Sequence, residues 1–283
     1  MEYRNPDALV ETEWLAQRLD DPSIRIVDAT WFMPNVDRSA KDEVAARHIP
    51  GAVFWDIDEI ADPVDPLPHM VPGATEFAHF MANLMISDGA RVIAYDRTGM
   101  SNAPRAWWTL RYFGHDNVSV LNGGMNKWIV EGHPTDTSSP PACSGQYTAT
   151  VQPALIRSRE EIFANIETAG EQVLDARAAG RYAGAEPEPR AGMRSGHIPG
   201  SLNLPFGNLI DSESGLFRDA DAMAACFAEA GIDMNRPIVT SCGSGVTACV
   251  LALGLHLLGH DSVAVYDGSW TEWGGRDDTP IET

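Results

Sequence analysis

The segment RPIVTSCGSGVTACVLALGLHLLGH, residues 236–260, decides the fold of this chain. A short run rich in β-branched residues, 238–241, leads into Cys242 and a glycine-spaced loop, and a long apolar run follows. The first run is typical of a buried strand and the last of a buried helix. The segment therefore predicts a strand, a tight loop and a helix, which is the repeating unit of a parallel α/β sheet.

A second copy of this unit, RVIAYDRTGMSNAPRAWWTLRYFGH, occupies residues 91–115. Further motifs recur in the same order at an offset of 145–149 residues: Asp28 with Asp175, HIPG at 48–51 with HIPG at 197–200, GHD at 114–116 with GHD at 259–261, and Trp128 with Trp273. So long an offset indicates duplication of a whole domain and excludes a solenoid of short repeats.

The predicted fold class is α/β, with two tandem domains that each hold a mainly parallel sheet flanked by helices on both faces. We expect the domains to span residues 1–135 and 150–283. Residues 136–149, rich in Pro, Ser, Thr and Gly, are expected to form a linker over the surface. The strands are expected at Ile24–Val27, Val92–Tyr95, Val118–Leu121, Val173–Leu174, Ile238–Ser241 and Ser262–Tyr266.

Composition excludes several classes of protein. The 283 residues include 20 basic and 40 acidic ones, and the net charge of −20 would repel nucleic acid and anionic membranes. No run approaches the roughly 18 apolar residues of a membrane span. The amino-terminal stretch has no signal-peptide pattern, so we expect a cytoplasmic protein. The 4 cysteines show no metal-binding or disulfide spacing, which predicts free thiols and no metal site. The sequence also has no nucleotide-phosphate loop and no lysine with a cofactor signature, so we expect no dissociable cofactor.

Cys242 is expected at the carboxyl end of a strand, where a loop turns into a helix. Backbone N–H groups at a helix start favour an anion, so we expect this thiol to be ionised near neutral pH and to act as a nucleophile. Gly243 and Gly245 have no Cβ, and they allow the backbone to curl around the sulfur. Cys226 and Cys249 lie in apolar helical stretches and are assigned to packing.

The first half of the chain places Asp96 at the position equivalent to Cys242. Because a carboxylate cannot carry sulfur, we expect only the second domain to be reactive. The first domain then serves as a scaffold that covers the site.

The paired HIPG turns, the Asp-containing first strands and the closing YDGSWTEWG resemble the rhodanese superfamily of sulfurtransferases, from about Leu9 to Pro280. Within that superfamily CGSGVT, residues 242–247, is similar to the active-site loop of the 3-mercaptopyruvate branch. The resemblance implies that Cys242 takes sulfane sulfur from a small-molecule donor as a persulfide. A thiol, a thioredoxin or cyanide then accepts the sulfur.

The residues after the cysteine bear on the donor. Enzymes dedicated to thiosulfate, a dianion, resemble one another in carrying basic residues there, whereas this chain has Gly243 and Ser244. The expected donor is therefore 3-mercaptopyruvate, with pyruvate as the product. A thiosulfate sulfurtransferase and a non-catalytic persulfide carrier remain the alternatives.

The stretch GRYAGAEPEPRAG, residues 180–192, looks like the family's substrate-binding segment and implies that Arg181 and Arg190 bind the donor. The alternative for each is a salt bridge, and Arg177 is assigned to the fold. The loop residues expected to contact substrate are Gly243, Gly245, Val246 and Thr247, with the Thr247 side chain expected to bond the backbone.

The resemblance also implies a proton-transfer set of Asp58, His69 and Ser244. Asp58 would orient His69, and His69 would contact Ser244. The first domain would then supply two residues to a loop of the second.

A phosphatase with a related fold is the other reading of a reactive cysteine on such a loop. That chemistry requires arginine six positions after the cysteine, where this chain has Ala248. The sequence therefore disfavours phosphoryl transfer.

Overall fold

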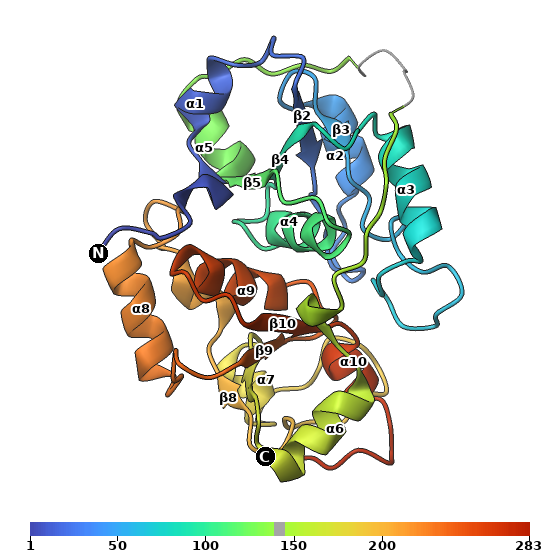
Figure 1. Ribbon diagram of the computed structural model, residues 1–283, viewed down its shortest axis with the longest axis vertical. Coiled ribbons are helices and arrows are strands. Elements are labelled where there is room, and N and C mark those ends of the chain that lie inside the picture. Colours follow the sequence, from blue (N-terminus) through green and yellow to red (C-terminus); the bar gives the residue numbers. More distant parts are fainter. Residues whose placement is uncertain (139–144) are drawn as a thin grey trace.

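The computed structural model describes residues 1–138 and 145–283, and Cys143 lies outside the described residues. Two five-stranded sheets lie one in each half of the molecule (Figure 1). The first has the order β1 (Leu9–Val10), β5 (Val118–Leu121), β4 (Arg91–Tyr95), β2 (Ile24–Asp28), β3 (Val53–Phe54). The second has the order β6 (Ile156–Arg157), β10 (Val263–Tyr266), β9 (Ile238–Ser241), β7 (Gln172–Asp175), β8 (Leu202–Asn203).

The two sheets repeat one another strand for strand, and every pair of neighbouring strands is parallel. Their registers also agree, since Asp28 pairs with Tyr95 in the first sheet and Asp175 with Ser241 in the second. Asp96 directly follows Tyr95, and Cys242 directly follows Ser241. The predicted fold class is confirmed, and each expected strand is found within a residue of its predicted bounds.

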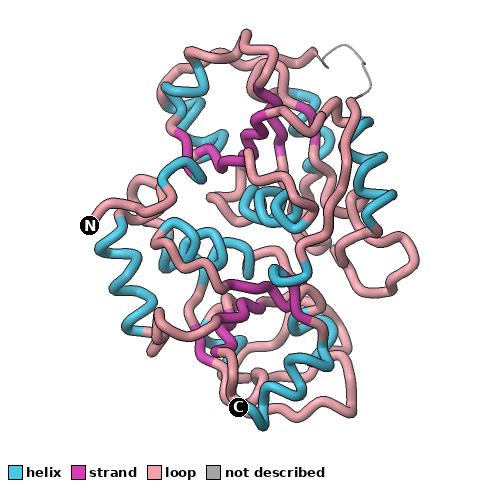
Figure 2. Tube along the Cα trace, in the orientation of Figure 1, coloured by secondary structure: helices cyan, strands magenta, loops and turns pink. Residues whose placement is uncertain are grey.

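Helices follow the strands and cover the sheets on both faces (Figure 2). In the first sheet Ile93 and Tyr95 belong to one hydrophobic cluster, whereas Val92 and Ala94 belong to another. Alternate side chains of one strand are thus buried on opposite faces, as parallel sheets require. The helices are α1 (Thr12–Ala16), α2 (Ala40–Ala46), α3 (Ala74–Asn83), α4 (Ala103–Tyr112), α5 (Gly124–Val130), α6 (Arg159–Thr168), α7 (Ala179–Tyr182), α8 (Ala220–Glu229), α9 (Ala248–Leu257) and α10 (Ser269–Trp273), with short 3-10 turns at Pro6–Ala8, Pro153–Leu155 and Phe206–Leu209.

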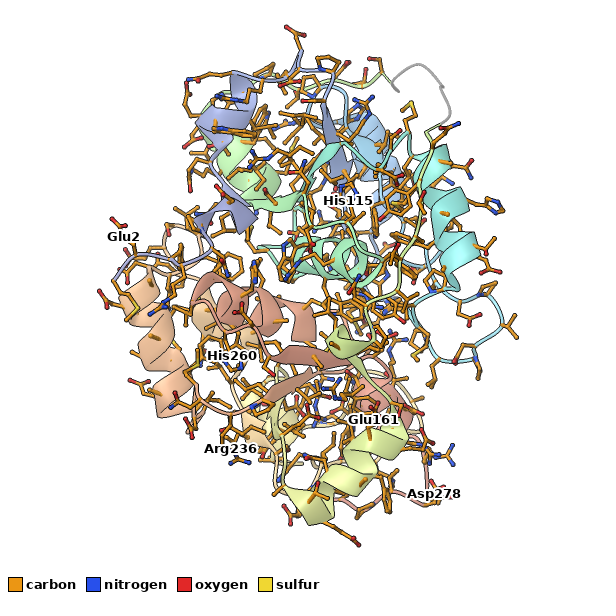
Figure 3. All side chains as sticks on the ribbon, in the orientation of Figure 1. Glu2, His115, Glu161, Arg236, His260 and Asp278 are labelled. Carbon is orange, nitrogen blue, oxygen red and sulfur yellow. The ribbon has the colours of Figure 1, made fainter. Side chains whose placement is uncertain are left out.

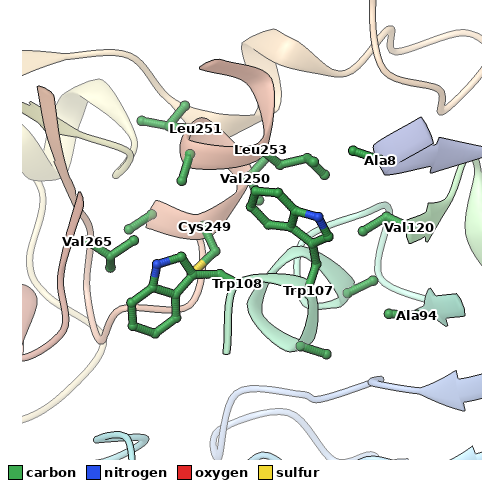
Figure 4. Packing of buried hydrophobic residues seen from close by; sticks show 14 of the residues in the cluster. Ala8, Ala94, Trp107, Trp108, Val120, Cys249, Val250, Leu251, Leu253 and Val265 are labelled. Atoms are coloured by element: carbon green, nitrogen blue, oxygen red, sulfur yellow. The ribbon is translucent and has the colours of Figure 1, made fainter. Parts of the chain in front are cut away.

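The two halves meet along α4 and α9, which lie against each other between the sheets (Figure 1). Trp107 and Trp108 of α4 lie beside Cys249 and Val250 of α9 in one cluster that continues into both halves (Figure 4). A helix that is apolar all round must be buried, as α9 is. The shared core fixes the loops before α4 and α9 relative to each other.

Two segments outside the sheets, the amino-terminal residues and the segment that joins the two halves, are held by backbone hydrogen bonds. The backbone N–H of Arg4 donates to the Leu257 carbonyl at 2.8 Å, so the amino-terminal residues pack on the second half. After the undescribed residues the chain returns along the first half, where Thr150 N–H donates to the Phe113 carbonyl at 2.9 Å. Within the described ranges, no helix is long and apolar enough to cross a membrane.

Candidate active site

Cys242 directly follows β9 and lies at the wall of a cavity of about 390 Å³ between the two halves. Its residue surface is only 1% exposed. The Cys242 N–H donates to Ser269 Oγ at 3.1 Å, and its carbonyl accepts from Trp270 N at 3.0 Å. The end of β10 and the start of α10 therefore hold the cysteine backbone at the cavity wall.

The loop after Cys242 presents its backbone amides as a group. Gly245 has φ +75°, and a Cβ on it would lie 2.7 Å from the Asp267 carbonyl oxygen, so the turn requires glycine. Throughout residues 243–248, no backbone N–H donates a hydrogen bond to another group in the described part of the chain. Such a set of amides ahead of a helix favours negative charge.

The equivalent loop of the first domain, which carries Asp96, binds an anionic group with its backbone amides. The Asp96 carboxylate accepts hydrogen bonds from the amides of Thr98 at 2.9 Å, Met100 at 3.0 Å, Asn102 at 2.8 Å and Ala103 at 2.7 Å. Gly99 has φ +73°, nearly the value of Gly245 in the other loop. The first domain therefore satisfies its loop amides with a fixed carboxylate.

His69 lies between Ser244 and Asp58. Its Nδ1 is 3.1 Å from Ser244 Oγ, and its Nε2 is 3.0 Å from Asp58 Oδ1. Trp31 Nε1 also donates to Asp58 Oδ2, at 2.9 Å. The hydrogen bond with His69 lowers the pKa of the Asp58 carboxyl, which keeps it ionised near neutrality. An ionised Asp58 accepts from Nε2–H, which leaves Nδ1 to accept from the Ser244 hydroxyl.

Arg105 of α4, which sequence reasoning missed, connects the two loops that carry this set. Its guanidinium donates to the His69 carbonyl at 2.5 Å, the Gly245 carbonyl at 3.2 Å and Asp267 Oδ1 at 2.6 Å. Asp267 Oδ2 in turn accepts from the Val71 amide at 2.8 Å. Both charged side chains are almost fully buried. The ion pair therefore fixes the His69 segment against the Cys242 loop.

Arg190 lines the same cavity without an acceptor. Its Nη2 is buried and has no hydrogen-bond partner in the described residues. Burial lowers the pKa of the Arg190 guanidinium, and the negative charge of Asp58 opposes that shift. The alternative for Arg190, a local ion pair with a neighbouring glutamate, is not found in the described residues, where Glu188 pairs instead with Arg177 and Arg181.

Arg181 and Arg177 are both tied to Glu188. Arg181 Nε donates to Glu188 Oε2 at 3.1 Å, with a second bond from Nη2, and this pairing holds its guanidinium beside Gly243. Arg177 also pairs with Asp175 at 2.6 Å, in agreement with its assignment to the fold. Arg181 thus lines the cavity as half of an ion pair, whereas Arg190 lines it with no carboxylate partner among the described residues.

The remaining loop residues divide into two groups. Gly243, Val246 and Thr247 line the cavity with Cys242 and Ser244, whereas Gly245 does not. The Gly245 carbonyl faces Arg105, so the glycine shapes the loop rather than its lining. Thr247 precedes α9 but makes no side-chain capping bond, and the expectation that it bonds the backbone is wrong.

The other described cysteines are separated from this chemistry. Cys249 is fully buried, its Sγ lies 3.2 Å from the Gly245 carbonyl oxygen, and burial raises the pKa of its thiol. Cys226 is half-buried on α8, and burial raises its pKa too. Residues 1–138 and 145–283 contain no group of three or more His, Cys, Asp or Glu side chains placed to hold a metal ion.

The first half contributes further cavity walls that no sequence pattern marked. They are Trp31, Phe32, Met33, Thr98, Ser101 and Asn102. The last three come from the Asp96 loop itself. An apolar lining with a few convergent polar groups is typical of a small-molecule site.

A repeated parallel sheet with a cysteine loop at one carboxyl edge defines the class of protein, and the comparisons agree with it. The family described as rhodanese-like domain matches residues 11–131 and again residues 158–276. The chain therefore belongs to the rhodanese family and carries two such domains.

Two curated relatives cover almost the whole chain. It is 43% identical over 272 residues to 3-mercaptopyruvate sulfurtransferase of Rattus norvegicus, with 94% of this chain and 91% of that protein covered. It is 41% identical over 283 residues to thiosulfate sulfurtransferase of Rattus norvegicus, with 98% and 94% covered.

Solved structures repeat the fold. The crystal structure of SseA from Escherichia coli, a 3-mercaptopyruvate sulfotransferase, matches with a TM-score of 0.85 at 37% identity, covering 93% of this chain and 98% of that one. The sulfur transferase subunit of the yeast mitochondrial complex I matches with a TM-score of 0.89 at 36% identity, covering 97% and 98%.

Proposed function

We propose that this protein is a 3-mercaptopyruvate sulfurtransferase whose nucleophile is Cys242. The observation that carries the proposal is the chain of contacts from Asp58 through His69 to Ser244, which ends two residues from the cysteine. A fixed proton path at this position suits a donor whose reaction releases a carbanion-like product. Thiosulfate has no such requirement, because its product sulfite leaves as an anion.

In the first proposed half-reaction, sulfur passes from 3-mercaptopyruvate to Cys242. The Cys242 thiolate attacks the sulfur of 3-mercaptopyruvate, and a sulfur–sulfur bond forms as the carbon–sulfur bond breaks. The electron pair of the broken bond passes to carbon, and the enolate of pyruvate leaves and takes up one proton. We propose that Ser244 and His69 hold and pass that proton, with Asp58 balancing the charge on His69, and the contacts among the three side chains support this role.

In the second half-reaction an acceptor thiolate attacks the outer sulfur of the Cys242 persulfide. The sulfur–sulfur bond to Cys242 breaks, and its electron pair regenerates the thiolate. The free amides of residues 243–248 suit both the thiolate and the persulfide anion. A small thiol, a thioredoxin or cyanide is the proposed acceptor.

Arg190 is the proposed ligand of the donor carboxylate, because its guanidinium faces the cavity with an unused donor. Arg181 is proposed to bind the substrate less directly, since Glu188 already neutralises its charge. One unpaired guanidinium in the cavity matches a monocarboxylate better than a dianion.

Thiosulfate sulfurtransferase activity is the second candidate, because relatives of that name cover this chain as fully as the 3-mercaptopyruvate enzymes do. The loop argues against it as the main activity, since residues 243–247 contain no cation. Measuring kcat/KM for both donors decides between them. Equal or higher efficiency with thiosulfate would reverse our assignment.

Intact mass tests the persulfide. After incubation with 3-mercaptopyruvate and no acceptor, we expect a gain of one sulfur atom that Cys242→Ser abolishes. The matched controls Cys249→Ser and Cys226→Ser should retain it. Labelling that survives in Cys242→Ser would refute the assignment of the nucleophile.

Turnover separates an enzyme from a carrier. With excess 3-mercaptopyruvate and a small thiol, we expect continuous release of pyruvate, whereas a carrier would react once and stop. Ser244→Ala and His69→Asn should lower kcat by about 100-fold or more if they serve proton transfer. We also propose a cytoplasmic location, which fractionation of cells would test.

A further inference from the structure

A second cavity, of about 330 Å³, lies beside the first sheet at the end where β4 and β5 begin. It is lined by Arg91, where β4 begins, and by His256 near the end of α9. Cys242 instead lies beyond the carboxyl end of β9 and before the start of α9. The two cavities share no lining residue. Since α9 spans residues 248–257 and an α-helix rises about 1.5 Å per residue, the two sites lie roughly 15 Å apart along it.

Three arginines line this second cavity, Arg4, Arg91 and Arg111. Within the described ranges, neither Arg4 nor Arg91 has a carboxylate within ion-pairing distance, and the buried Nε of Arg91 has no acceptor. Arg111 pairs with Asp116 at 3.4 Å, but the Asp116 side chain is 83% exposed, so water screens this pair. Among the described residues Arg91 has only uncharged contacts, with Ser119 Oγ at 3.4 Å and the Trp14 ring at 4.5 Å, so the positive charge in the cavity exceeds the negative charge paired with it. In a chain of net charge −20, such a local excess of positive charge favours an anion.

The rest of the lining includes the exposed Asp7 as well as neutral polar groups. Asn5 Nδ2 donates to the His256 carbonyl at 2.8 Å, and Arg111 Nη1 lies 3.4 Å from His256 Nδ1. Burial, and then the charge of Arg111, lower the pKa of His256 to about 4, so the ring is neutral near neutral pH. The lining thus places arginines of the amino-terminal segment and of the first half beside a neutral His256 of the second half.

We propose that this cavity binds a small multivalent oxyanion, either inorganic phosphate or the phosphate group of an organic ester. Guanidinium groups match phosphate oxygens with paired donors, and several can share one phosphate. A ligand held by Arg4, Arg91 and Arg111 would connect the amino-terminal segment to the first sheet beside α9. Binding only to the folded state would also raise the free energy of unfolding, with the logarithm of ligand concentration once that exceeds the Kd.

Calorimetric titration of the full chain with sodium phosphate and with glycerol phosphate, at ionic strength held constant with chloride, tests the site. We expect saturable binding that Arg91→Gln or Arg4→Gln weakens at least about tenfold, as loss of a charged hydrogen bond implies. Tighter binding of the ester would identify an organic phosphate as the natural class. Equal binding would identify the inorganic ion.

Two controls separate this site from general charge effects and from the Cys242 cavity. Arg236→Gln removes the same charge on the second half, far from α4 (Figure 3), and should leave the affinity unchanged. Arg190→Gln alters only the Cys242 cavity and should also leave it unchanged. Arg4 is exposed, so its variant should fold even where Arg91→Gln does not. Absence of saturable binding, or loss of binding in Arg190→Gln with retention in Arg4→Gln, would overturn the proposal.

Discussion

Replacing Arg105 by Gln should damage both stability and turnover. The guanidinium is 3% exposed and its partner Asp267 is 2% exposed, at a distance of 2.6 Å. Removing one partner of a buried ion pair leaves the other charge without compensation, which typically costs about 3–5 kcal/mol. That is a large part of the roughly 5–15 kcal/mol by which domains are stable.

The activity should fall by more than unfolding explains, because Arg105 also holds the carbonyls of His69 and Gly245. His69 itself has φ +64°, a conformation that its surroundings must maintain. Without this anchor His69 is free to drift from Ser244. We therefore expect a lower kcat for 3-mercaptopyruvate with KM changed little.

Urea denaturation followed by tryptophan fluorescence measures the first effect, and steady-state kinetics on folded protein measures the second. The double variant Arg105→Gln/Asp267→Asn should be more stable than Arg105→Gln alone, because it removes the unpaired buried charge. A loss below about 1 kcal/mol in the single variant, or no recovery in the double one, would refute the ion-pair reasoning.

Three further predictions concern the active site. Arg190→Ala should raise KM for 3-mercaptopyruvate and cost about 2–5 kcal/mol in kcat/KM, since a charged contact is lost; steady-state kinetics that match wild type would remove Arg190 from the site. The pKa of Asp58 is lowered, so its contribution to stability is present above the ordinary value and is lost as pH falls through the folded value. The difference in Tm between wild type and Asp58→Asn should therefore shrink below about pH 4, and a constant difference would contradict this. Gly245→Ala should destabilise the protein by about 1–3 kcal/mol in urea denaturation because of its positive φ, whereas Gly243→Ala, without positive φ, should cost less.

The sequence alone determined what depends on local patterns and on comparison of the chain with itself. The β-branched run before Cys242 and the apolar run after it specify a buried strand and a buried helix, whatever surrounds them. Duplication then specified two similar sheets, and the observed strand orders agree. The position of Cys242 after a strand followed from the same local reasoning.

Tertiary structure decided which distant groups meet. His69 and Ser244 are 175 residues apart, and Arg105 and Asp267 are 162 apart, so no periodicity relates them. Resemblance to a family named the first pair, but no signal in a single sequence marked Arg105. Its position on α4 suits packing equally well, and only the contact of α4 with α9 brings it to both loops.

The arginines near the cavity are a further case in which the tertiary structure decided what the sequence left open. Arg177, Arg181 and Arg190 lie close together in sequence beside acidic residues, and sequence offers no rule for which of them Glu188 neutralises. In the fold Glu188 pairs with Arg177 and Arg181, and no carboxylate in residues 1–138 and 145–283 pairs with Arg190. The charge that a donor meets in the cavity depends on this choice, because a buried ion pair forms only where packing brings both partners into hydrogen-bond geometry.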